Sequence, residues 1–369
     1  MNKKILVILG IIIVLALIIS FSYKTRTNNK ETIKIGAMLP MTGPAGIYGE
    51  CQYNGALLAV EETNKNGGVN GQKLELILQD TKGDVKEGVN TFNNIKGQVK
   101  TVITAISGIV LSVGSVADKD HVVVMNIGAK SPKISQAGDY VFSTVQNSDA
   151  DEIVFAQYVK NDLKLNNIAV IAVNNDYGLG TSDAFAKAFV SEGGKIVGTE
   201  KYEASATDFR TILTKIKVLK PEGIFIVGYK EQGLLLKQAT SLGIKTQWLA
   251  PEPFASPDII ALAGVSADGV IYHAPGLNSD VEPAKSYFKN YEARFNKPAD
   301  FCSANSYDGV KLFIKAISAV GNDGEKIKNW LYNEKNWIST TGSSTFNSNG
   351  DVLKALNIMT VKDGKFVRK

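Results

Sequence analysis

The chain has 369 residues, which is enough for two domains of ordinary size. Hydrophobic residues make up 44% of it and glycine occurs 34 times, a composition typical of a globular α/β protein rather than a disordered chain. The net charge of +5 is spread along the chain without a Lys/Arg cluster interleaved with aromatics, so we expect no nucleic-acid binding. Only two histidines, His121 and His273, and two cysteines without metal-ligand spacing occur, so we expect no metal, no cofactor and no Ser/His/Asp triad.

The first 22 residues have the pattern of an export segment. Lys3 and Lys4 precede an apolar stretch from Ile5 to Phe21, which is a positive region followed by a hydrophobic one. Small residues around Phe21 suit cleavage, whereas an uncleaved stretch would be at the short end of membrane-spanning length. Residues 1–22 are therefore either a signal peptide or an N-terminal membrane anchor, with 23–31 as a tether. Both alternatives predict that the rest of the chain is extracytoplasmic.

Residues 33 to 80 have the pattern of one strand–helix–strand unit. An apolar run of strand length, Ile33 to Leu39, is stopped by Pro40, which cannot donate to a sheet ladder. A helix is predicted from about Ile47 to Asn66, and a second strand from Leu74 to Gln79. Such a unit implies parallel strands with a right-handed crossover, and open α/β sheets bind ligands at the ends of their strands.

Strand and helix patterns alternate along the rest of the chain. Apolar runs predict strands at 101–106, 122–126, 140–144, 168–173, 195–202, 223–227, 247–250 and 269–272. Apolar residues at helical spacing predict helices at 85–97, 110–118, 151–163, 181–192, 207–219, 233–242, 283–295, 303–320 and 326–332. The tail from 344 to 367 has a β pattern with turns at Asn349-Gly350 and Asp363-Gly364.

This alternation predicts an α/β fold of two Rossmann-like lobes, each a mostly parallel sheet with flanking helices. The pattern restarts near residue 149, and the second sheet looks complete by 274, so the helices after it should return to the first lobe. We therefore expect lobe 1 to comprise 32–146 plus 275–341, and lobe 2 to comprise 147–274 plus 342–369. A hinge of several crossings leaves a cleft between the lobes, where small molecules commonly bind and around which lobes can close.

Five short motifs are spread over most of the chain from Ile33 to Lys369. They are Gly36–Pro44 with Tyr48-Gly49, Asn66–Leu74 with Asp80, Asn175–Gly178, Gly228-Tyr229 with Gly243–Gln247, and Asn305–Gly309. In this order they resemble the type I periplasmic binding proteins, and most of all the Leu/Ile/Val-binding branch that serves ABC transporters. The resemblance implies a small-molecule ligand and ABC permease subunits as partners.

The resemblance also implies residues that hold the two ends of an amino-acid ligand. In the amino-acid binders of this family a hydroxyl after the third strand and backbone amides after the fourth hold the ligand carboxylate, and Ser107 and Gly128 stand at those places. Glu252 matches a glutamate that takes the ligand ammonium. A buried zwitterion needs such partners because unpaired buried charge is costly. From the residues alone, Ser107 can also be a helix N-cap and Glu252 an exposed loop acid.

Three tyrosines and one lysine complete the expected site. Tyr48, Tyr177 and Tyr229 match aromatic positions that line the cleft in this family. Lys130 stands where the family has a hydroxyl, which is a departure from its pattern. Lys130 either adds a cation to the site, suiting a strongly acidic ligand, or points to solvent.

Two classes of function remain open from the sequence. The first is an extracytoplasmic solute-binding protein that takes an amino acid or related small carboxylate and delivers it to a permease. The alternative is an anchored ligand-sensing receptor or regulatory module of the same fold. No constellation of nucleophile, base and oxyanion donors can be named, so we expect no enzyme. Export would permit a disulfide between Cys51 and Cys302, which depends on their geometry in the fold.

Overall fold

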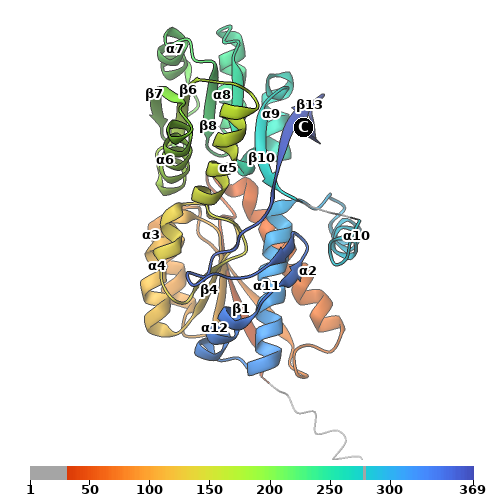
Figure 1. Ribbon diagram of the computed structural model, residues 1–369. Helices are drawn as coiled ribbons and strands as arrows, with labels where there is room; N and C mark the ends of the chain where they lie inside the picture. The colour runs from red at the N-terminus through yellow and green to blue at the C-terminus, as the bar shows by residue number, and fades with distance from the viewer. Residues whose placement is uncertain (1–30, 277–279) are drawn as a thin grey trace, which may run out of the picture.

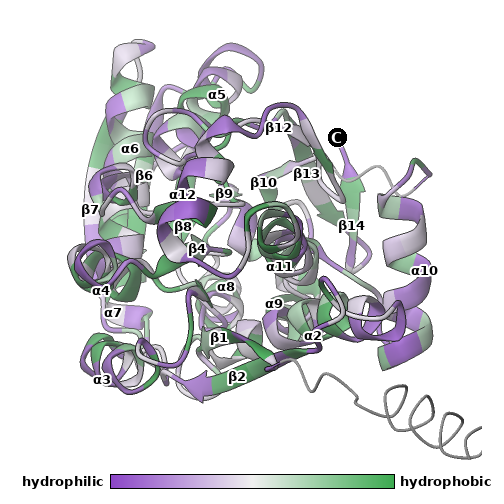
Figure 2. Cartoon of the chain, turned by 90° about the horizontal axis from the view of Figure 1, so that it is seen from below, coloured by the Kyte–Doolittle hydropathy of each residue, from purple (hydrophilic) through white to green (hydrophobic). Residues whose placement is uncertain are grey.

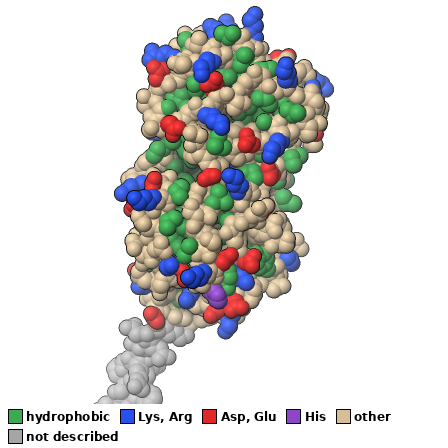
Figure 3. Space-filling view, turned by 90° about the vertical axis from the view of Figure 1, so that its left-hand side faces the viewer, with side chains coloured by type: hydrophobic (Ala, Val, Ile, Leu, Met, Phe, Trp, Pro, Cys, Tyr) green, Lys and Arg blue, Asp and Glu red, His purple; other side chains and the backbone are tan. Residues whose placement is uncertain are grey.

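The computed structural model describes residues 31–276 and 280–369, which form two lobes stacked along one long axis (Figure 1). The expected export segment, 1–22, and the tether up to residue 30 lie outside the described residues. Within the described residues no helix is long and apolar enough to cross a membrane. Lys/Arg and Asp/Glu side chains are interspersed over both lobes on the face that Figure 3 shows.

The first lobe is built on a sheet of five parallel strands in the order β2-β1-β3-β4-β5, counted over the described residues. The strands are β1 (Ile33–Leu39), β2 (Leu74–Asp80), β3 (Thr101–Thr104), β4 (Val123–Asn126) and β5 (Val141–Ser143). The helical elements around them are η1 (Gly46–Tyr48), α2 (Gly49–Lys65), α3 (Val85–Ile95), α4 (Ser107–Asp120), η2 (Pro132–Gln136), α10 (Ala284–Phe295), α11 (Phe301–Val320) and α12 (Gly324–Asn333). Helices cover both faces, which is why every residue of β3 and β4 is buried, without alternation.

The second lobe contains a seven-stranded sheet in the order β14-β13-β10-β9-β8-β6-β7. Its parallel strands are β6 (Asn167–Val173), β7 (Lys195–Tyr202), β8 (Gly223–Val227), β9 (Gln247–Ala250) and β10 (Ile271–Pro275). The tail adds the antiparallel hairpin β13 (Leu356–Lys362) and β14 (Lys365–Arg368), which turns at Asp363-Gly364 as predicted. Its helical elements are α5 (Ser148–Asn161), α6 (Asp176–Ser191), α7 (Arg210–Val218), α8 (Gln232–Ser241), η3 (Glu252–Phe254), α9 (Pro257–Ala263) and η4 (Gly264–Ala267).

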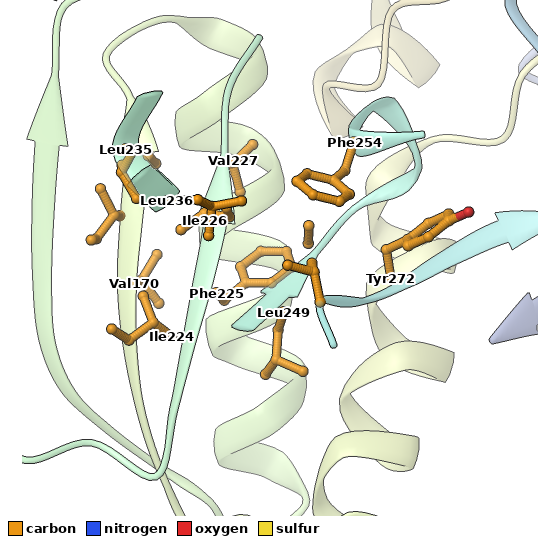
Figure 4. Close-up of a cluster of buried hydrophobic side chains, with 14 of the residues drawn as sticks. Val170, Ile224, Phe225, Ile226, Val227, Leu235, Leu236, Leu249, Phe254 and Tyr272 are labelled. Atoms are coloured by element: carbon orange, nitrogen blue, oxygen red, sulfur yellow. The ribbon is translucent and has the colours of Figure 1, made fainter. Parts of the chain in front are cut away.

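The core of the second lobe shows why these strands are so apolar (Figure 4). Phe225 of β8 and Leu249 of β9 are fully buried, and the ring of Phe225 stacks on Phe185 of α6 at 4.1 Å between centroids. Phe254 and Tyr272 extend the same cluster beyond the end of β9. Burying a side chain of this size stabilises the fold by about 1.5–3 kcal/mol, so the apolar run of each strand also dictates its burial.

The chain passes between the lobes three times within the described elements, between β5 and α5, between β10 and α10, and before β13. The helices after β10 pack on the first lobe, where Tyr287 of α10 and Val310 of α11 are core residues. Phe346 and Val352 also belong to that core. The segment 342–355, expected in lobe 2, therefore lies on lobe 1, and the last crossing starts beyond Val352.

The helices α2 and α11 pack closely against each other in the first lobe. A Cβ on Gly55 of α2 would lie 2.0 Å from the backbone oxygen of Ser303 in α11, so only glycine permits this approach. Figure 2 shows α11 nearly end-on among the other elements of the lobe. Asp300 caps α11 with a reciprocal hydrogen-bond pair to Ser303, which fixes where the helix starts. The N-terminal ends of both helices consequently face the cleft.

Two short elements and one helix start differ from the sequence-based expectation. Helix α9 and the small hairpin of β11 (Trp337–Ser339) and β12 (Gly342–Ser344) were not predicted. Helix α4 starts at Ser107 instead of about residue 110. Its first turn contains Gly108, a poor helix former, and tertiary packing overrides that local preference.

Candidate functional site

A cleft of about 450 Å³ lies between the lobes and is lined from both of them. This volume is in the range of small-molecule sites. Six of the seven expected site residues are among those that line it: Tyr48, Ser107, Gly128, Tyr177, Tyr229 and Glu252. Apolar side chains such as Ile47, Ile127 and Val145 form much of the remaining wall. The fold thus brings together residues that lie up to 204 positions apart in the sequence.

The floor of the cleft in lobe 1 is formed at the ends of β3 and β4. Ser107 is the first residue of α4, not the residue that precedes the helix, and its Oγ accepts a hydrogen bond of 3.2 Å from the backbone N–H of Ser131. Because Ser107 Oγ is the acceptor in this bond, its own hydroxyl proton can be donated to another group. Because the N-terminus of a helix carries partial positive charge, this corner favours an anionic group.

The backbone after β4 is engaged within the chain. The N–H groups of Gly128 and Ala129 both donate to Oδ1 of Asn126, at 3.1 and 2.7 Å. Asn126 in turn donates from Nδ2 to the carbonyl of Ala129 and to Ser143 Oγ, which locks the turn. The Gly128 amide that the resemblance associates with a ligand carboxylate therefore already has a partner.

Three tyrosines form an aromatic wall that spans the cleft. Tyr48 of lobe 1 donates its hydroxyl to the backbone oxygen of Pro253 in lobe 2 at 2.9 Å, and its ring lies 6.3 Å from that of Tyr229. Tyr229 and Tyr177 are 5.6 Å apart, and the Tyr229 oxygen accepts from Asn175 Nδ2 at 3.1 Å. Burial raises the pKa of Tyr48 and of Tyr177 well above the usual value, so both hydroxyls stay neutral donors.

Lys130 is buried beside the cleft and does not reach solvent, so that alternative was wrong. Its Nζ lies 2.8 Å from Asp151 Oδ2 and 3.6 Å from Glu252 Oε2. Its backbone oxygen accepts from both the N–H and the hydroxyl of Ser148, which ties it to the first hinge crossing. Burial alone lowers the pKa of Lys130, but Asp151 and Glu252 outweigh it and the net pKa is raised, so the lysine is charged.

Glu252 is the first residue of η3, at the end of β9, and lines the cleft from lobe 2. Its side chain is 15% exposed, whereas those of Lys130 and Asp151 are 3% and 2% exposed. Glu252 is therefore not an exposed loop acid. Lys130 thus faces two carboxylates, Asp151 and Glu252, and the half-buried Lys354 also interacts electrostatically with both.

Comparison with known proteins decides the family. The family model described as "Periplasmic binding protein" matches residues 32–365. The chain belongs to the periplasmic binding protein family. Among curated relatives, the "Leu/Ile/Val-binding protein homolog 3" of Brucella melitensis is 30% identical over 346 residues, which are 91% of this chain and 93% of that protein.

Solved structures place this periplasmic binding protein in the same fold as two amino-acid binders. A leucine binding protein from Thermotoga maritima superposes with a TM-score of 0.85 at 24% identity, covering 92% of this chain and 98% of that one. The branched-chain amino acid transporter substrate binding protein of Streptococcus pneumoniae, in complex with isoleucine, has a TM-score of 0.82 at 26% identity, covering 92% and 100%. The predicted family and the two-lobed type I fold are thus confirmed, and the family comprises extracytoplasmic solute-binding proteins rather than enzymes.

Sequence reasoning missed several polar residues that this binding protein places on the cleft. Gln52 and Asn54 come from α2, and Asn305 comes from α11. Polar residues among the apolar positions of a packed helix would have been the only signal. Cys51 and Cys302 also line the cleft and form a disulfide with 5.9 Å between their Cα atoms, which joins the first turns of α2 and α11.

Proposed function

We propose that the cleft binds an amino acid or a closely related small carboxylate and that the protein delivers it to an ABC permease. The observation that carries this proposal is the opposite polarity of the two ends of the cleft. The N-terminus of α4 with Ser107 favours an anion in lobe 1, and Glu252 favours a cation in lobe 2. The apolar and aromatic wall between them suits an aliphatic or aromatic side chain.

The charges beside Glu252 support an ammonium group on the ligand. Lys130 is paired at 2.8 Å with Asp151, which also accepts from Gln146 Nε2 at 2.7 Å. Glu252, at 3.6 Å from the lysine, is the less compensated carboxylate. A ligand ammonium at Glu252 would add a favourable opposite charge beside this carboxylate, whereas an amine-free carboxylate would offer it no such partner. The names of the relatives, which include leucine, isoleucine and valine binders, agree with this class of ligand.

Ligand binding and lobe closure are coupled in this proposal. The hydrogen bond from Tyr48 to Pro253 joins the two lobes across the cleft. A ligand that touches both lobes stabilises the closed form by contacts that the open form lacks, which shifts the population. The closed form would present both lobes to the permease. The N-terminal segment 1–22 would direct export and would then either be cleaved off or anchor the protein in the membrane.

A thermal-shift panel on the full chain in mild detergent, refolded to remove bound ligand, tests the proposal. The panel contains the standard amino acids and matched acids that lack the α-amine. At 100 times Kd a ligand adds about 2.7 kcal/mol to the free energy of unfolding, which is readily detected. We expect a shift with at least one amino acid that its amine-free analogue does not produce, and that Glu252→Gln abolishes. A shift with amine-free acids alone would overturn the role of Glu252.

A further inference from the structure

Gln52 places a side-chain amide against the carboxylate corner of the cleft. It lies in the first turns of α2, is only 4% exposed and lines the cleft. Within the described residues its Oε1 is buried without a hydrogen-bond partner, and its donor end, Nε2, makes no hydrogen bond to the chain either. A buried amide that lacks partners is costly, so its retention at this place points to a partner that is not part of the chain.

The position of the amide is set by a glycine on the neighbouring strand end. A Cβ built on Gly128 would lie 2.9 Å from Gln52 Nε2 and 3.2 Å from the Cβ of Ala105. Gly128 is not among the residues with positive φ, so backbone conformation does not require a glycine there. What Gly128 provides is space, and the amide of Gln52 occupies it.

The Gln52 amide matters because backbone N–H groups near it already donate to another residue of the chain. The N–H groups of Gly128 and Ala129 are both spent on Asn126, so the turn after β4 offers no free amide in these two residues. The donors left at this corner are the hydroxyl of Ser107, the N-terminus of α4 and the NH₂ of Gln52. Two of them belong to one element, and Gln52 approaches from another direction.

We propose that Gln52 donates from Nε2 to the ligand carboxylate, in place of the engaged backbone after β4, and that it is a specificity-determining residue of the cleft. Its role rests on the proposed function, because it requires a ligand that carries a carboxylate. Gly128 acts as a positioning residue that keeps the space for the amide. A hydrogen bond to a charged group is stronger than a neutral one, so its loss lowers affinity by about ten- to a hundredfold.

Isothermal titration of the full chain with L-leucine tests this role. Gln52→Met keeps the length of the side chain and removes the donor, and we expect Kd to rise about ten- to a hundredfold. Gln52→Glu keeps the shape but adds a charge of the same sign as the carboxylate, so its loss should exceed that of Gln52→Met. Gln98→Met, at an exposed glutamine on the surface of lobe 1, is the matched control and should leave Kd unchanged.

A second pair of variants separates a ligand contact from a structural role. Gly128→Ala should push the amide aside and weaken leucine binding in the parent, but have little further effect in a Gln52→Ala background. Unfolding midpoints in urea should change little while Kd changes. Equal Kd values for the parent, Gln52→Met and Gln52→Glu would overturn the inference, as would losses that merely follow lower midpoints. If the parent bound no amino acid and no carboxylate at all, the proposed ligand class would fail and this inference with it.

Discussion

Lys130 and Asp151 form an ion pair between the two lobes in which both side chains are almost completely buried. Nζ and Oδ2 are 2.8 Å apart, with 3% and 2% of the side chains exposed. Lys130 follows β4 in lobe 1, and Asp151 lies in α5 directly after the first crossing. The pair therefore joins the lobes at the hinge itself, beside the carboxylate of Glu252.

Breaking this pair should be expensive for stability. Lys130→Met leaves the side chain of Asp151 buried and without its ion-pair partner, although it still accepts from Gln146, and we expect a loss of about 3–5 kcal/mol in the free energy of unfolding. Urea unfolding followed by circular dichroism measures the loss. Lys133→Met is a suitable control, because its side chain is exposed and pairs with Asp176 only at 3.7 Å. Equal losses for the two variants would contradict the assignment.

Removing the disulfide should destabilise lobe 1. The bond between Cys51 and Cys302 closes a loop with a sequence separation of 251, and we expect a loss of about 2–4 kcal/mol for the Cys51→Ser/Cys302→Ser double variant. The free energies of unfolding of oxidised parent, reduced parent and double variant would be compared in urea. The reduced parent should resemble the double variant. An oxidised parent no more stable than either would show that the bond does not contribute.

The hydrogen bond between Tyr48 and Pro253, which joins the two lobes, can be removed by deleting one oxygen atom. Tyr48→Phe loses the hydroxyl that donates to Pro253 across the cleft, which weakens the closed form by about 0.5–1.5 kcal/mol. Affinity for leucine should fall by roughly two- to tenfold, measured by isothermal titration, because binding must then drive closure without this bond. Tyr53→Phe changes a tyrosine of α2, the helix that follows Tyr48, at a position that is not among the cleft residues, and this variant should bind as the parent does.

Stability should depend on pH through the buried pair of His273 and Glu152. Nε2 and Oε1 are 3.0 Å apart, and both side chains are 1% exposed. Burial alone lowers the pKa of His273, but the charge and hydrogen bond of Glu152 outweigh burial and raise it. Asp151 adds to this rise in the pKa, and Lys130 opposes it. The net folded pKa lies above the unfolded value of about 6.5.

The direction of the pH dependence follows from which state, folded or unfolded, holds the proton of His273 more tightly. The folded state does, so the stabilisation is complete below about pH 6.5 and is lost as the pH rises through the folded pKa of His273. Urea unfolding at several pH values between about 6 and 9 should show parent stability falling more steeply than that of His273→Gln, by up to about 1.4 kcal/mol for each unit of pKa difference. Parallel curves for the two proteins would exclude this linkage.

Much of the secondary structure could be predicted because buried parallel strands are continuous apolar runs. The bounds predicted for β7, β8 and β9 agree with the structure. Helix starts were harder, as α4 illustrates. Its first residues, Ser107 and Gly108, are poor helix formers, and only packing in the lobe makes them helical.

The sequence by itself determined the two α/β lobes, the family and six of the residues that line the cleft, because these follow from local hydrophobic patterns and short motifs. Only the tertiary structure decided what those residues touch. Of the two alternatives for Lys130, the structure excludes solvent, and its ammonium lies beside Asp151 and Glu252 of the other lobe. Gln52 lines the cleft because α2 packs against the end of β4, and this contact joins segments far apart in the sequence. Side chains from distant segments meet only when the whole chain has packed, which is why the chemistry of this cleft is a property of the fold.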